Sequence, residues 1–196
     1  MSERKASVTR QTSETAVKVT LNLDGDGRSN VETGVGFFEH MLNLFSRFSL
    51  WDLDVAAEGD LAVDAHHTVE DVGIALGQAF SEAIGTKEGI RRFGYAVVPM
   101  DEALALVAVD ISGRAHVALN ADFPATRVGD FDTELVLEFF RAFAYNAGIT
   151  IHLNVLAGRN THHIIEALFK ASGRALGDAA SFDPRVKGIP STKGTL

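Results

Sequence analysis

Hydrophobic and polar positions along the chain follow two periods, one of two residues and one close to 3.6. Alternation predicts a strand at 15–27 that ends on a turn, a hairpin return at 29–34, and further strands at 50–57, 103–112, 115–123 and 149–158. Apolar residues spaced by three and four predict helices at 37–48, 66–85, 133–148 and 162–179. The chain therefore mixes strands and helices throughout its length.

The order of these elements repeats along the chain. Each half reads strand, strand, helix, strand, helix, and an offset of 96 residues (66 to 162) aligns HHTVE with HHIIE and Gly77 with Gly173. Solenoid repeats have periods of only roughly 20 to 50 residues. We therefore expect an α+β fold of two pseudo-symmetric ββαβα half-domains that arose by internal duplication, with sheets packed against helices. The predicted parts are a first half at 1–86, a connecting segment at 87–102, a second half at 103–183 and a C-terminal tail at 184–196.

Histidine is concentrated in the repeated segments, because four of the seven His form two adjacent doublets, each followed by a Glu. On a helix, that Glu shares a face with either histidine, while the two neighbouring histidines splay apart by about 100°. Each doublet can therefore serve two different ions. One further His or Glu stands at matching places on the helix that precedes each doublet. The candidate metal ligands are His40, His66, His67, Glu70, Glu138, His162, His163 and Glu166.

The absence of cysteine from the 196 residues restricts the chemistry of any metal site. Imidazole and carboxylate ligands without thiolate suit Mn²⁺, Fe²⁺, Ni²⁺ or Zn²⁺, and eight ligands divide into two sites of four. A simpler interpretation takes each doublet as a solvated helix start with a favourably placed Glu, but its duplication argues against this. His116 and His152 have no duplicated partner and are interpreted as ordinary strand positions, with a supporting role behind a ligand as the alternative for His152.

Charge and hydropathy exclude several classes of partner. There are 18 Lys and Arg against 26 Asp and Glu, a formal net charge of −8, which disfavours binding to nucleic acid or to an acidic membrane. The N-terminus lacks the apolar core of a signal peptide, and no apolar run approaches the roughly 20 residues that span a bilayer. We expect a soluble cytoplasmic protein without nucleic-acid or membrane partners.

Three turn-like segments place Arg, Ser or Lys beside Gly. They are GIRRFG at 89–94, SGRAHV at 112–117 and GIPSTKG at 188–194. Such a composition is typical of a phosphate pocket. Each segment taken singly also fits a solvated loop, so the pocket needs independent support.

The motifs together resemble the imidazoleglycerol-phosphate dehydratase family of histidine biosynthesis. GFFEHML, DAHHTVEDVGIALGQA, SGRAHV, RNTHHIIEALFKA and IPSTKG occur in that family's order, from about residue 10 to 196. The resemblance implies a metal-dependent hydro-lyase, a carbon–oxygen lyase that converts imidazoleglycerol phosphate to imidazole acetol phosphate plus water. It also implies two Mn²⁺ per subunit and a large symmetric homo-oligomer, of about 24 chains in the family, with sites shared between subunits.

The resemblance further implies residue roles. One ion would be held by His40, His67, Glu70 and His163, and the other by His66, Glu138, His162 and Glu166. Substrate phosphate would rest on Arg92, Arg114, Ser191 and Lys193, with Lys170 as a further contact. Glu14 would contact substrate and transfer protons, with Glu70 or Glu166 as alternative catalytic carboxylates. Many family members carry His where this chain has Glu138, so charge and metal preference at the second ion could differ here.

Two other functions use the same types of ligand. A non-enzymatic, ferritin-like metal-storage protein also builds paired sites from His and Glu on helices, but four alternating strands disfavour an all-α bundle. A dinuclear metallohydrolase would need a bridging hydroxide in place of a binding site for imidazole. The ligands alone do not separate lyase from hydrolase, and only the resemblance favours the lyase.

Overall fold

Two units of the same topology follow one another in the computed structural model, which describes residues 3–196. The first unit contains β1 (Lys5–Gln11), β2 (Thr15–Asn22), β3 (Ser29–Glu32), α1 (Gly36–Ser49), β4 (Asp52–Gly59) and α2 (His66–Ile84). The second contains β5 (Phe93–Met100), β6 (Ala103–Asp110), β7 (His116–Asn120), the short pair β8 (Arg127–Val128) and β9 (Phe131–Asp132), α3 (Leu135–Ala147), β10 (Thr150–Ala157) and α4 (Thr161–Ala180). The predicted α+β fold and its duplication are confirmed.

Each unit forms a four-stranded sheet with the same order of strands, β1-β2-β4-β3 in the first and β5-β6-β10-β7 in the second. The pairs β3–β4 and β7–β10 are parallel, while the other pairs are antiparallel. Parallel neighbours need a crossover connection, and here the crossovers are α1 and α3. The alternation of each inner strand buries one face, as at Val17, Val19 and Leu21 of β2.

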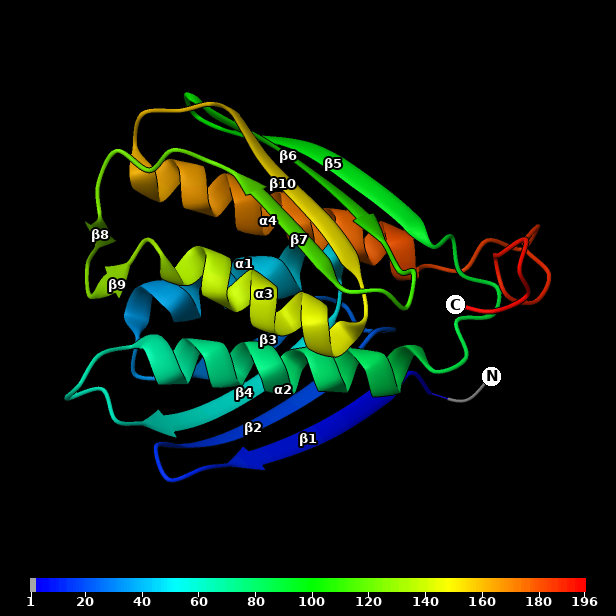
Figure 1. The fold of residues 1–196 in the computed structure, drawn as a ribbon, viewed down its shortest axis with the longest axis horizontal. Helices are drawn as coiled ribbons and strands as arrows, with labels where there is room; N and C mark the ends of the chain where they lie inside the picture. Colours follow the sequence, from blue (N-terminus) through cyan, green and yellow to red (C-terminus); the bar gives the residue numbers. More distant parts are fainter. Residues whose placement is uncertain (1–2) are drawn as a thin grey trace.

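The helices form a layer between the two sheets, as Figure 1 shows. α2 packs on β1 and β2, and α4 packs on β5 and β6. The other two helices cross between the units, because α1 of the first unit packs against α4 and α3 of the second packs against α2. The two units therefore share one helical layer and are not independent domains.

Three predictions about the strands are wrong. Each four-stranded sheet has one more strand than expected, because β1 precedes the first predicted strand and β5 lies inside the segment 87–102 that we expected to be a connection. Both are edge strands: β1 has no fully buried position, and Gly94 and Pro99 weaken the strand pattern of β5. The short pair β8–β9 was not predicted either. The segment 29–34 is also not a hairpin return, since β3 pairs with β4 and not with β2.

Backbone-to-backbone contact joins the crossing helices. A Cβ atom added at Gly77 of α2 would lie 2.5 Å from the carbonyl oxygen of Phe143 on α3, and one added at Gly173 of α4 would lie 2.5 Å from that of Phe45 on α1. Buried aromatic rings fill the space around these contacts, including Phe45 and Phe143 with ring centroids 6.0 Å apart. No helix within residues 3–196 combines the length and apolar character that a bilayer crossing requires.

Gly173→Ala should destabilise the protein, because the added methyl would also lie 3.1 Å from the amide nitrogen of Ser49, so α1 must move. We expect the free energy of unfolding to fall by roughly 1–3 kcal/mol, the usual cost of overpacking. Gly36→Ala is the matched control, since no atom lies within 4 Å of its added Cβ. Urea unfolding of both variants measures the difference, and equal midpoints would show that the helix contact tolerates a methyl group.

Candidate metal centre

All four helices begin at the same end of the molecule, on the left in Figure 1. The eight predicted ligands lie in the first two turns of these helices, so the shared orientation gathers them at one end. Polar side chains fix where the doublets start. Asp64 Oδ1 accepts a hydrogen bond from the backbone N–H of His66 at 2.7 Å, and Asn160 Oδ1 accepts from those of His162 and His163 at 3.0 and 3.4 Å.

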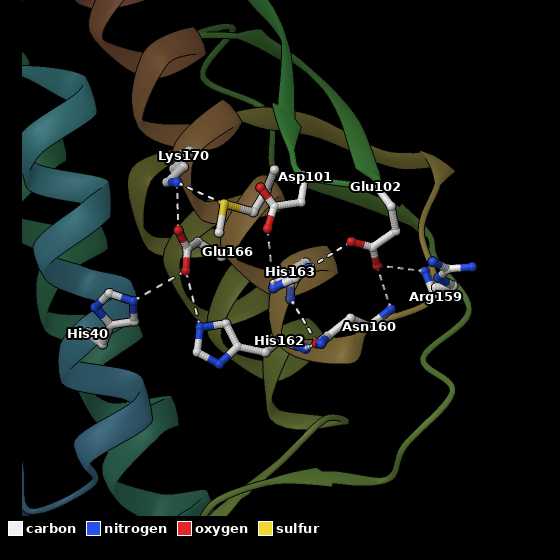
Figure 2. A network of polar contacts seen from close by, with 10 residues as sticks. His40, Asp101, Glu102, Arg159, Asn160, His162, His163, Glu166 and Lys170 are labelled. Atoms are coloured by element: carbon white, nitrogen blue, oxygen red, sulfur yellow. Dashed lines mark hydrogen bonds and ion pairs between the residues drawn. The ribbon is translucent and has the colours of Figure 1, made fainter.

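The first cluster, here called the α1–α4 group, consists of His40, His162, His163 and Glu166. Glu166 Oε2 lies 3.3 Å from His40 Nε2 and 3.1 Å from His162 Nε2, as Figure 2 shows. Residues 3–196 contain one group of three His, Asp or Glu side chains whose ligand atoms all lie within 4.8 Å of one another. It consists of His40, His162 and Glu166. The packing of α1 on α4 thus brings His40 to residues of α4 that follow it by 122 or more positions (40 to 162).

The carboxylate of Glu166 is buried yet charged. Burial opposes its ionisation, but the ammonium group of Lys170, 2.5 Å from Oε1, and the two imidazoles hold the pKa of Glu166 below its ordinary value. Lys170 Nζ also lies 3.3 Å from Met100 Sδ. Lys170, expected to contact substrate, therefore borders the α1–α4 group and keeps its central carboxylate in the ionised form that metals bind.

The second cluster, the α2–α3 group, consists of His66, His67, Glu70 and Glu138. His66 Nε2 lies 4.0 Å from Glu70 Oε2, and Glu138 stands on α3, the helix that packs against α2. The carboxylate of Glu138 is 3.0 Å from Arg141 Nη1 one turn later. Within residues 3–196, no hydrogen bond or ion pair joins a member of this group to a member of the α1–α4 group. The described part of one chain therefore presents two separate groups of candidate ligands.

The second histidine of each doublet is bound at its Nδ1 atom by a carboxylate that the sequence patterns did not reveal. His67 Nδ1 lies 3.0 Å from Asp60, and His163 Nδ1 lies 2.7 Å from Glu102. These hydrogen bonds raise the pKa of both imidazoles, and the contact with His163 lowers the pKa of Glu102 to about 2. Glu102 is remote from His163 in sequence, so no local spacing could have identified it.

Glu14 lies in the turn between β1 and β2, directly before the predicted strand that starts at residue 15. Its Oε2 atom is 3.7 Å from His67 Nδ1, and its side chain is half-exposed. The hydroxyl of Thr12 accepts hydrogen bonds from the N–H groups of Glu14 and Thr15, and Thr15 in turn donates to the buried Asp71 of α2. The turn thus holds Glu14 beside the α2–α3 group.

The predicted phosphate ligands come together in one cavity of about 260 Å³. Its lining includes Arg92, Arg114, Ser191 and Lys193. Arg92 is held by Asp110 at 2.7 Å and by the carbonyl oxygen of Pro190 at 2.9 Å. This cavity, here called the phosphate pocket after its predicted ligand, is also lined by Leu196 and therefore lies beside the C-terminus, which is marked at the right in Figure 1.

The phosphate pocket is far from both groups of ligands in the same chain. The N–H of Arg92 donates to the carbonyl oxygen of Ala179, which is near the end of α4, whereas His162 is at its start. These 17 residues (162 to 179) span about 25 Å at 1.5 Å per residue. His116 and His152 belong to neither group: they lie side by side and exposed on β7 and β10, with ring centroids 5.8 Å apart.

Comparisons with known proteins agree with one another. A family model described as imidazoleglycerol-phosphate dehydratase matches residues 33–176. A curated protein of that name from Acetivibrio thermocellus is 59% identical over 99% of this chain and 100% of its own length, and one from Symbiobacterium thermophilum is 61% identical over 100% of this chain and 94% of its own.

Solved structures give the same result. The crystal structure of imidazoleglycerol-phosphate dehydratase from Staphylococcus aureus superposes with a TM-score of 0.83 at 44% identity, covering 91% of this chain and 99% of that one. The Pyrococcus furiosus structure, solved in complex with (S)-C348, also has a TM-score of 0.83, at 37% identity, and covers 96% of this chain and 100% of that one. The similarity therefore extends over essentially the whole fold.

Proposed function

Because this chain belongs to the imidazoleglycerol-phosphate dehydratase family, and is thus a hydro-lyase of histidine biosynthesis, we propose that it works with two Mn²⁺ ions at a site shared between subunits. The reaction converts imidazoleglycerol phosphate to imidazole acetol phosphate and water. The observation that carries the proposal is the clustering of His40, His162 and Glu166 at the helix starts. We place the reaction in the cytoplasm, because a charged phosphate ester crosses bilayers poorly.

The residues of both groups fit a divalent ion of intermediate hardness. Their donors are imidazole nitrogens and carboxylate oxygens, a set that suits Mn²⁺ as well as Fe²⁺, Ni²⁺ or Zn²⁺, and the pKa of the buried Glu166 is held below its ordinary value. Ligand atoms already lie within 4.8 Å of one another in the α1–α4 group. When bound, the two ions would stabilise negative charge on the substrate's imidazole and on its departing hydroxyl group.

The division of ligands that the family implies draws equally on both groups. The first ion would take His40 and His163 from the α1–α4 group with His67 and Glu70 from the α2–α3 group. The second would take His162 and Glu166 from the former with His66 and Glu138 from the latter. Since the two groups do not meet within residues 3–196 of one chain, we propose that the α1–α4 group of one subunit faces the α2–α3 group of the next. Such a head-to-tail contact forms a closed ring when the rotation between successive subunits completes a full turn.

The phosphate pocket supports the same arrangement. A substrate made of an imidazole ring, three carbons and a phosphate is about 10 Å long when extended. It cannot reach from His162 to the phosphate pocket of the same chain, which begins at the far end of α4. We propose that Arg92, Arg114, Ser191 and Lys193 bind the phosphate of a substrate whose imidazole lies at the metal ligands of a neighbouring subunit.

Proton transfer requires a carboxylate near the reacting carbons. The carbon beside the imidazole loses hydroxide and the middle carbon loses its C–H proton, which together make water and leave an enol. The enol hydroxyl then loses its proton and the carbon beside the imidazole gains one, which gives the ketone. We assign these proton movements to Glu14, which lies beside His67 and is half-exposed, so that it can reach a ligand bound there. A dinuclear hydrolase with the same ligands is not favoured, because the relatives found over the full length are dehydratases.

His67→Ala and His162→Ala should each remove one of two Mn²⁺ ions per chain, since each takes a ligand from a different ion. Elemental analysis of the purified variants measures the metal content, and an assay of imidazole acetol phosphate on metal-reconstituted protein measures activity. We expect two ions and activity in the wild type, and one ion with roughly 10²-fold or greater loss of activity in each variant. Wild-type metal content in either variant would assign its doublet to an ordinary helix start.

Mixed assemblies test whether one site combines several chains. Arg114→Ala damages the phosphate pocket and His162→Ala damages the metal ligands, so each pure assembly should be inactive. Subunits of the two variants, dissociated and reassembled together with Mn²⁺, should regain about a quarter of wild-type activity if the two parts come from different chains. No recovery at all, with mixed assembly verified by mass spectrometry, would place both parts in one chain.

Glu14→Gln separates proton transfer from the metals, because Glu14 is not among the predicted ligands. We expect both Mn²⁺ ions and the assembly to be retained while kcat falls by roughly 10²- to 10⁴-fold, the usual contribution of a positioned acid or base. A loss mainly in KM would instead indicate that Glu14 only orients the substrate. A kcat within about threefold of wild type would remove Glu14 from the mechanism.

A further inference from the structure

The two histidines of each doublet have different surroundings. The second histidine directs Nδ1 at a carboxylate: both oxygens of Asp60 lie 3.0 and 3.2 Å from His67 Nδ1, and Glu102 Oε2 lies 2.7 Å from His163 Nδ1. Figure 2 shows the latter contact. The first histidine directs Nε2 at the Glu one turn later on its own helix, at 4.0 Å for His66 and 3.1 Å for His162. The second histidines therefore share an environment that the first do not.

A carboxylate on Nδ1 has a definite effect on an imidazole. It accepts the Nδ1–H hydrogen bond, which fixes the tautomer and leaves the lone pair of Nε2 for a metal. It also fixes the orientation of the ring and increases the donor strength of Nε2. Asp60 and Glu102 thus prepare His67 and His163 to bind an ion through Nε2.

Internal duplication does not account for this pair of carboxylates. Asp60 follows β4 in the loop that leads to α2, whereas Glu102 lies in the tight turn between β5 and β6. These positions do not correspond in the two units, yet each carboxylate reaches the Nδ1 atom of the second histidine. The turn that corresponds to that of Glu102 lies between β1 and β2 and carries Glu14, whose carboxylate is 3.7 Å from His67 Nδ1, whereas Asp60 makes the closer contact at 3.0 Å. The hydrogen-bonded contact therefore comes from two unrelated loops, which is expected if the contact matters for the chemistry of the site.

We propose that Asp60 and Glu102 are positioning residues for one of the two ions and make it the more tightly bound of the pair. The inference rests on the proposed function, in which His67 of one subunit and His163 of another bind the same ion. That ion then has two histidines supported at Nδ1 by carboxylates outside the ligand set. The histidines of the other ion have no such support, because His162 contacts its fellow ligand Glu166 and His66 contacts Glu70, a ligand of the first ion. The two sites are thus unequal although the chain is duplicated.

Asp60 provides the cleaner test of the two. The side-chain oxygens of Glu102 also accept the backbone N–H groups of Arg159 and Asn160, at 3.2 and 2.8 Å, so Glu102 additionally anchors the loop before α4. Both oxygens of Asp60 face His67. Asp60→Asn keeps the size and one acceptor but removes the charge, and Asp54→Asn, on the exposed face of β4, is the matched control.

Titration of the assembled, metal-stripped protein with Mn²⁺ measures both affinities per chain. For Asp60→Asn we expect two ions, with one of them bound roughly 10- to 100-fold more weakly, and an unfolding midpoint equal to that of the wild type. Glu102→Gln should weaken the binding of the same ion. Asp54→Asn should change the affinity of neither ion. In the His162→Ala background, which keeps the ion of His67, Asp60→Asn should still weaken the remaining ion. In the His67→Ala background it should have no effect.

The outcomes are distinguishable from a failure of the proposed function. A wild-type protein that binds no divalent ion would remove both the metal site and the positioning role. Wild-type affinities in Asp60→Asn, with two ions bound in the wild type, would overturn only the positioning role. Equal weakening of both ions would also overturn it, because it would indicate a general effect on the helix starts.

Discussion

The structure depends on the close approach of helices that belong to different halves of the chain. Gly77 lets α2 contact the backbone of α3, and Gly173 lets α4 contact that of α1. Because of this exchange, neither unit has a complete core alone, and the aromatic residues of all four helices pack into one cluster. The same contact places His40, which precedes the second doublet by more than a hundred residues, against Glu166. The arrangement of the ligands is thus a direct result of helix packing.

Much of this could be predicted from periodicity and spacing. The four helices, the duplication and the ligand-type residues in the first turns follow from local patterns, which depend mainly on burial of one helix face. The edge strands β1 and β5 were missed because an edge strand needs no buried alternation. The pairing of strands could not be predicted either, because β3 pairs with β4, a strand that follows α1 in the chain. Glu102 is 61 residues from His163, and only tertiary packing brings the two together. Asp60 is seven residues from His67, but the loop between them has no regular period that would predict the contact.

The distribution of chemistry along the molecule explains why one chain is insufficient for the proposed reaction. The ligands stand at the starts of the helices, whereas the phosphate pocket is built where α4 ends and β6 leads to β7. A rigid sandwich of this length cannot fold one end onto the other. In the proposed arrangement each chain contributes different parts to different sites, so assembly would be a condition of catalysis and not only a source of stability.

The parallel orientation of the four helices also has an electrostatic consequence. The start of a helix carries about half a positive charge from its aligned peptide dipoles, and such ends normally attract anions. Four of them lie at the end where we propose cations to bind. In the proposed sites the carboxylates of Glu70, Glu138 and Glu166 would act as counter-charges to the helices as well as ligands, and Asp60 and Glu102 would add to this balance. The positive field that remains around the proposed ions would suit a substrate that develops negative charge as it loses hydroxide.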